Sequence, residues 1–132
     1  MADDNLVIYT VLKGEHTRAA EAVRAKHRRW LVPGLFTSEL LSALTKYLRD
    51  GSLSRDAAVR AYRRGTSLVT FAMQRSDPVA VLNLCARSDC SSYDAKYVAL
   101  AMSQNVPLVT ADQQLIQAFP EQAIDFRSFA RG

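Results

Sequence analysis

Four acidic side chains occupy positions where a buried carboxylate would be unfavourable in free energy: Asp3, Glu39, Asp94 and Asp112. Two of them fall in segments with apolar helix faces, and one directly follows an apolar strand. Burying an unpaired charge costs several kcal/mol or shifts its pKa until the group is neutral. If the four converge, two of them about 4 Å apart would repel by roughly 4 kcal/mol at an effective dielectric of about 20. A divalent cation reverses the sign of that interaction, so a converging quartet indicates a metal site.

Asp94 is the most informative of the four. At 100° per residue, Tyr97 and Val98 lie on the apolar arc of a helix expected over 91–103, and Asp94 falls inside this arc. The simpler explanation is a second capping residue, favoured by the helix dipole. Because Ser91 and its neighbour already supply caps, we predict instead that the Asp94 carboxylate faces a site.

Each of the other three acids has a plain structural alternative. Glu39 lies on the flank of its helix and could pair with Lys46. Asp112 would by itself be the N-cap of the short helix that follows it, although a carboxylate has two oxygens and can cap and ligate at once. Asp3 alone would be a solvated terminal acid, and the neighbouring Asp4 leaves open which of the two is the first acid of the site.

No other catalytic chemistry competes with this prediction. His16 and His27 both lie in polar surroundings, and no Ser–His or Cys–His pairing is supported locally. Cys85 and Cys90 lack the spacing of a zinc site and are expected to be reduced thiols in a cytoplasmic protein. The chain also has no glycine-rich phosphate loop and no HExxH helix.

The charge balance favours a polyanionic partner. If four of the 13 acids serve a metal, nine acids remain against 17 basic residues. The basic residues form two runs: Arg24, Lys26, Arg28 and Arg29, and Arg55, Arg60, Arg63 and Arg64. A basic surface around an acidic site suits a nucleic acid, although each run alone could be an ordinary solvated helix face.

Length and hydropathy limit the architecture. The 132 residues are expected to form a single domain, residues 1–132. No apolar run approaches the roughly 18 residues of a membrane span, and the first residues, MADDN, do not form a signal peptide. We therefore expect no association with a membrane.

Short β-rich runs alternate with helical stretches along the chain. The expected elements are a strand or helix at 5–12, helices at 17–29, 35–49, 54–74 (with Gly65 as a break), 78–87, 91–103 and 113–118, and strands at 30–33 and 106–111, with a last strand that includes Ile124 and Phe126. This alternation predicts an α/β fold, with a mainly parallel central sheet covered by helices on both faces. In such folds the ligand site lies beyond the carboxyl ends of the strands, so the four acids are expected to converge there.

The segments that carry the acids are ADDNLVIYTVLKGEHT, VPGLFTSELLSAL, CSSYDAKYVALA and VPLVTADQQLIQAF. In this order and spacing they resemble the PIN-domain ribonucleases, and within them the VapC-type toxins of bacterial toxin–antitoxin pairs. The last two segments, with Tyr93-Asp94-Ala95 and Thr110-Ala111-Asp112, are the most specific. The resemblance covers nearly the whole chain.

The resemblance implies a three-layer α/β/α sandwich and an endonuclease that hydrolyses RNA at a Mg²⁺ or Mn²⁺ site. By motif position, the catalytic and metal-binding acids would be Asp3, Glu39, Asp94 and Asp112, with Thr110 and Asn5 as supporting polar residues. The resemblance also implies a homodimer that is neutralised by a cognate antitoxin.

The chain departs from the family pattern at its start. Members of the family usually have an apolar strand of several residues before the first acid, whereas only Met1 and Ala2 precede Asp3 here. Asp4 also stands where Thr or Ser is usual. The short first strand favours one alternative, an inactive PIN-like module that binds RNA or an antitoxin without cutting. A second alternative is a DNA-directed nuclease with the same site.

Overall fold

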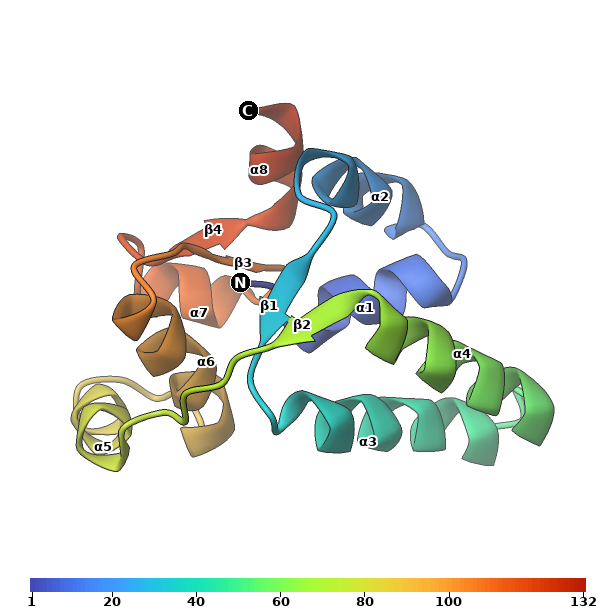
Figure 1. Ribbon diagram of the computed structural model, residues 1–132, viewed down its shortest axis with the longest axis horizontal. Helices are drawn as coiled ribbons and strands as arrows, with labels where there is room; N and C mark the ends of the chain where they lie inside the picture. The colour runs from blue at the N-terminus through green and yellow to red at the C-terminus, as the bar shows by residue number, and fades with distance from the viewer.

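Short parallel strands alternate with longer helices in the computed structural model, which describes residues 1–132 (Figure 1). The strands are β1 (Trp30–Val32), β2 (Val69–Phe71), β3 (Leu108–Thr110) and β4 (Ala123–Asp125). The helices are α1 (Asp4–Val11), α2 (Thr17–Lys26), α3 (Phe36–Arg49), α4 (Arg55–Ser67), α5 (Pro78–Ala86), α6 (Ser92–Ser103), α7 (Gln113–Ala118) and α8 (Phe126–Arg131).

Residues 1–3 join two pairs of parallel strands. β1 pairs with β2, and β3 pairs with β4. Between these pairs, the amide of Ala2 donates to the carbonyl of Leu31 over 3.1 Å, and the amide of Asp3 donates to the carbonyl of Val109 over 3.1 Å. The first residues therefore take the central position of a parallel arrangement with the order β2, β1, residues 1–3, β3, β4.

The strands separate two hydrophobic cores. Leu108 belongs to the core formed with α5, α6 and α7, whereas the next residue, Val109, belongs to the core formed with α1, α2, α3 and α4. Successive side chains of a strand point to opposite faces, so this alternation places one core on each face of the sheet. The predicted three-layer α/β/α architecture is confirmed.

Several helices begin at the predicted positions, and each of these has a side-chain N-cap. Ser54, Asp77, Ser91 and Asp112 each accept a hydrogen bond from a backbone amide in the first turn of the helix that follows. Such caps satisfy amides that have no partner within the helix, and each is worth about 1 kcal/mol. Asp125 caps α8 in the same way, and this last helix was not expected from the sequence.

Two boundaries differ from the prediction. The long helix expected over 54–74 ends at Ser67, and Val69–Phe71 forms the strand β2 instead. β-Branched and aromatic residues suit a strand, and pairing with β1 outweighs the helical pattern. Similarly, Phe126 was expected in the last strand but begins α8, because the Asp125 side chain caps a helix at that point.

Two other segments are now defined. The segment 5–12, which the sequence left open as a strand or a helix, is helical: α1 covers it as far as Val11, and Leu12 is the C-cap. The predicted helix over 17–29 is shorter than expected, since it ends at Lys26. None of the eight helices has both the length and the hydropathy that a bilayer span requires.

Candidate metal centre

Asp3 lies at the end of the central strand segment, directly before α1. Its side chain is buried, and its Oδ2 accepts a 2.5 Å hydrogen bond from the Thr110 hydroxyl. Burial raises the pKa of Asp3 well above its ordinary value, and the neighbouring Asp4 raises it further. The Thr110 hydroxyl and the Asn5 amide oppose this shift. Of the two adjacent acids, Asp3 is therefore the one enclosed by the fold, while Asp4 is partly exposed.

Thr110 connects two of the predicted site residues. Its buried hydroxyl donates to Asp3 and accepts a 3.0 Å hydrogen bond from the amide of Asp112. Asp112 follows the carboxyl end of β3 and caps α7, because its Oδ1 accepts from the amide of Gln114 over 2.9 Å. The capping role expected for Asp112 is confirmed, and it leaves Oδ2 without a protein partner.

Glu39 enters the same region from the first turn of α3. Its side chain is half-buried, and burial raises the pKa of the carboxyl. The charges of Asp3 and Asp94 raise it further, whereas the nearby Tyr97 hydroxyl lowers it. Glu39 Oε1 and the Tyr97 hydroxyl are nevertheless both buried without a hydrogen-bond partner, so no hydrogen bond joins the two groups. They are close enough for each to shift the pKa of the other.

Asp94 lies in the first turn of α6 and is half-buried. Burial raises the pKa of its carboxyl, as do the charges of Asp112 and Asp3, while the Ser91 hydroxyl lowers it. Ser91 supplies the helix cap by accepting from the Asp94 amide over 3.1 Å. The Asp94 side chain is therefore not needed as a cap.

At the carboxyl edge of the sheet, the negative charges of neighbouring acids raise the pKa of Glu39 and of Asp94. Asp3 acts on both Glu39 and Asp94, and Asp112 acts on Asp94. No three His, Cys, Asp or Glu side chains lie close enough together to hold an ion as they stand. The donor chemistry fits a hard divalent cation, since every group is a carboxylate and Glu39 Oε1 is buried without a partner.

Tyr97 is a neighbour of the site that the sequence analysis treated only as part of an apolar face. It lies one turn after Asp94 on α6, and burial together with the Glu39 carboxylate raises the pKa of its hydroxyl. This keeps the hydroxyl protonated and able to donate a hydrogen bond. Its spacing of three residues from Asp94 was the available signal, because residues three apart share a helix face.

A comparison with protein-family models matches residues 1–119 to the PIN domain. The chain belongs to the PIN-domain family. PIN domains are generally metal-dependent nucleases, and they typically bind divalent metal ions. The acidic carboxyl edge is thus the part of this PIN domain where such an ion is expected.

The fold agrees with that of a solved structure, the crystal structure of PAE2754 from Pyrobaculum aerophilum. The two share 24% sequence identity with a TM-score of 0.79, over 98% of this chain and 85% of the other. At this identity the likeness supports the PIN fold alone. No curated protein matches the sequence closely enough to count as a relative.

Proposed function

We propose that this PIN domain is a metal-dependent endoribonuclease, and specifically a VapC-type toxin that acts in the cytoplasm. The observation that supports the proposal is the burial of Asp3 beside the half-buried Glu39 and Asp94 at the carboxyl edge of the sheet, where the charge of Asp3 raises the pKa of both other carboxyls. Carboxylates brought together in this way are costly without a cation, and PIN proteins commonly act on RNA.

Three of the acids would hold the ion. Asp3, Asp94 and the free Oδ2 of Asp112 supply the hard oxygen ligands that Mg²⁺ or Mn²⁺ prefers. Bound there, the ion would neutralise negative charge on the scissile phosphate. Ligation requires the carboxylates to turn toward a common point. Thr110 limits this motion for the Asp3 carboxylate and holds the backbone of Asp112 in place.

Glu39 is assigned a different role. Its raised pKa makes it a better proton acceptor near neutral pH than an ordinary glutamate. The unpartnered Oε1 is available to accept a hydrogen bond from the attacking water. Tyr97 would act as a positioning residue, since its protonated hydroxyl lies close to Glu39 and is free to donate a hydrogen bond to that carboxylate.

The experiment that tests the proposal compares RNA and DNA as substrates. We expect the purified chain with Mn²⁺ to cleave single-stranded RNA and to leave a DNA of the same sequence intact, with no cleavage of either in EDTA. Cleavage of DNA at an equal rate would instead favour the DNA-directed nuclease. RNA binding without cleavage under any divalent ion would favour the inactive module.

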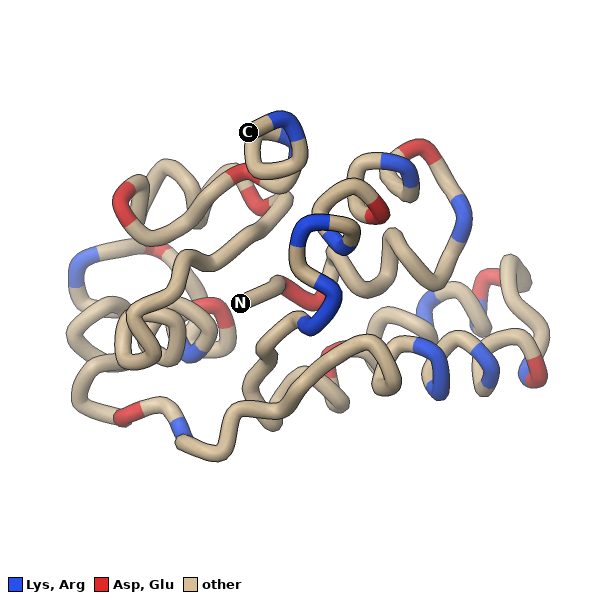
Figure 2. Tube along the Cα trace, turned by 45° about the horizontal axis from the view of Figure 1, so that its top comes forward, with Lys and Arg blue, Asp and Glu red and all other residues tan.

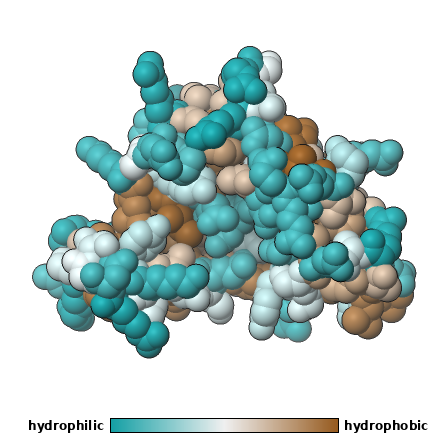
Figure 3. All heavy atoms as spheres, turned by 180° about the vertical axis from the view of Figure 1, so that it is seen from behind, coloured by the Kyte–Doolittle hydropathy of each residue, from teal (hydrophilic) through white to brown (hydrophobic).

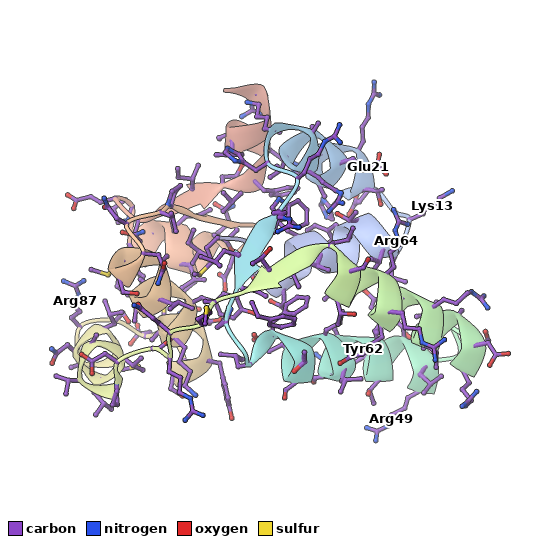
Figure 4. The ribbon with its side chains drawn as sticks, viewed as in Figure 1. Lys13, Glu21, Arg49, Tyr62, Arg64 and Arg87 are labelled. Carbon is purple, nitrogen blue, oxygen red and sulfur yellow. The ribbon has the colours of Figure 1, made fainter.

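A cognate antitoxin and a second copy of the chain are the proposed protein partners. An apolar groove of about 400 Å³ lies between α3 and α4, where Tyr62 is labelled in Figure 4. Leu41 and Leu48 line it and are 52% and 42% exposed. Two other apolar residues of the segment from α3 to the end of α4, Leu44 and Leu68, are buried in the protomer.

Figure 3 shows further brown apolar patches on the back of the molecule, separated by hydrophilic surface.

We expect the groove to mediate a two-fold dimer, the commonest closed oligomer. Light scattering at micromolar concentration should give twice the mass of the chain, and Leu41→Glu should reduce this to the mass of one chain. Leu82→Glu is the matched control, because Leu82 is 67% exposed on α5, away from the groove. A wild-type monomer, or an equal effect of both substitutions, would rule out the groove as the contact.

A further inference from the structure

A polar hollow lies at the amino edge of the sheet, opposite the acidic site. It measures about 420 Å³, and it is lined by Arg24, Arg28, Arg29, Ser67, Leu68, Val69 and Thr70. Arg28 and Arg29 directly precede β1, and Ser67 and Leu68 directly precede β2. Because β1 and β2 are parallel and begin here, the hollow lies at the other end of the strands from Asp3 and Asp112.

The arginines of this hollow have no acidic partner. None of the lining residues is Asp or Glu, and neither of the two ion pairs of the protein involves them. Nη1 of Arg24 is buried without any hydrogen-bond partner. A buried, unpaired donor on a charged group is rare in native proteins and calls for an ion or a water molecule.

An ordinary surface role does not account for the buried Nη1 of Arg24. In the same basic run, Lys26 is satisfied, since its Nζ donates to the carbonyl of Phe129 over 2.7 Å. Arg24 lies in the last turn of α2, where a cation favours the helix dipole, but that interaction leaves the buried Nη1 unpaired. Figure 2 shows basic positions grouped where α2 leads into β1.

We propose that this arginine hollow binds a phosphate group, and that in the protein's function the phosphate belongs to the RNA backbone. Guanidinium groups present several N–H donors in a planar fork that matches phosphate oxygens, and the exposed Thr70 hydroxyl adds a donor. This inference rests on the proposed function, because both take RNA as the substrate. It adds a binding point remote from the acids, which would hold the strand away from the bond that is cut.

The test measures RNA binding without cleavage. We would titrate a fluorescently labelled single-stranded RNA in EDTA at several salt concentrations, using wild type, Arg24→Gln and the double variant Arg28→Gln/Arg29→Gln. For a single strand, the slope of log affinity against log salt should fall by about 0.7 for each phosphate that the variant no longer neutralises. Arg28 and Arg29 are exposed, so the double variant keeps the fold, and a thermal melt checks Arg24→Gln.

Arg49→Gln is the matched control. It removes one positive charge at the end of α3, where the side chain points away from the molecule (Figure 4). We expect an unchanged salt slope for this variant. An equal loss of binding in Arg49→Gln, or full binding in the hollow variants, would overturn the proposal. Displacement of the RNA by an equal concentration of polyglutamate would also overturn it, because the hollow would then select charge rather than phosphate.

A further arm distinguishes the source of the phosphate. Inorganic phosphate could raise the melting temperature of wild type but not of Arg28→Gln/Arg29→Gln, while both proteins bind RNA equally well. In that case the hollow binds a small phosphate compound, and its assignment to the RNA backbone is wrong. The arms also separate this inference from the proposed nuclease. If the hollow variants cleave RNA and bind it as tightly as wild type, the phosphate site is refuted and the proposed nuclease is not. If the hollow variants lose RNA binding but the wild-type protein never cleaves RNA, the nuclease is refuted and the phosphate site is not.

Discussion

Replacing Asp94 by Asn removes a proposed ligand of the ion that would neutralise charge on the phosphate. We expect RNA cleavage to fall by on the order of 10²–10³-fold, as when a donor that stabilises transition-state charge is lost. The same change should leave the metal-free protein as stable as wild type or more so. Burial and the charges of Asp112 and Asp3 all raise the pKa of Asp94, so its ionised form is unfavourable in the fold without a cation. Asparagine removes that charge while the Ser91 cap stays in place.

Thermal melts with and without Mn²⁺ check this expectation. A ligand that binds only the folded state, present at 100 times its dissociation constant, stabilises by about 2.7 kcal/mol. Wild type should show such a shift, and Asp94→Asn should not. If Asp94 only assists the start of α6, its loss would cost at most about 1 kcal/mol and would not depend on metal. An equal Mn²⁺ shift in both proteins would exclude Asp94 as a ligand.

The pH dependence of the metal-free protein gives an independent check on the same cluster. Folding raises the pKa of Asp3, Glu39 and Asp94 above ordinary values of 3.8 for Asp and 4.5 for Glu. A carboxyl with a raised folded pKa contributes stability that is present at low pH and is lost as pH rises through the folded value. From these three groups, the free energy of unfolding in EDTA should therefore fall as pH rises from about 4 toward neutrality. Asp94→Asn should flatten that fall.

Replacing Thr110 by Val should damage both the fold and the activity. Valine fills the same buried space but loses the hydroxyl that donates to Asp3 and accepts from the Asp112 amide. Leaving a buried polar group without its partner costs about 1–3 kcal/mol. Because the hydroxyl orients the Asp3 carboxylate and holds the backbone of Asp112, we expect metal affinity and cleavage to fall by about 10–100-fold, as is typical for groups that support metal ligands.

Thr110→Ser separates the two effects. Serine keeps the hydroxyl and loses one methyl group, so it should cost about 0.8 kcal/mol of stability and retain most of the cleavage activity. Denaturant unfolding and single-turnover cleavage would be measured for both variants. If serine and valine lose activity equally, the hydroxyl has no role in orienting Asp3 and Asp112.

The sequence was most reliable where a single local interaction determines the structure. Asp77 with Pro78, Ser54 and Ser91 each signal a helix start, and each cap is formed. The apolar strand before Asp112 was predicted for the same kind of reason, since β3 is buried along its whole length. These features depend on neighbours within a few residues, so they can be derived without knowing the fold.

The α4–β2 boundary depends instead on distant parts of the chain. A Cβ atom on Gly65 would lie 2.9 Å from Leu40 Cδ2 and 3.3 Å from Val7 Cγ1, so this glycine marks a close approach of α4 to α3 and α1 rather than a break. Val69–Phe71 becomes a strand because β1 lies beside it. The helical pattern of residues 54–74 contains no information about pairing with β1. For this reason the helix was predicted to continue beyond Ser67.

For the candidate site, the sequence by itself determined the kinds of donor and their order along the chain: four carboxylates, each next to the start of a helix or the end of a strand. Only the tertiary structure decided that Asp3 rather than Asp4 is enclosed, because that depends on Ala2 and Asp3 pairing with Leu31 and Val109. It also decided that the basic run divides, with Lys26 bonded to α8 and the arginines around a separate hollow. Burial and pairing of charges arise from residues far apart in the chain, whereas residue type and helix caps are local.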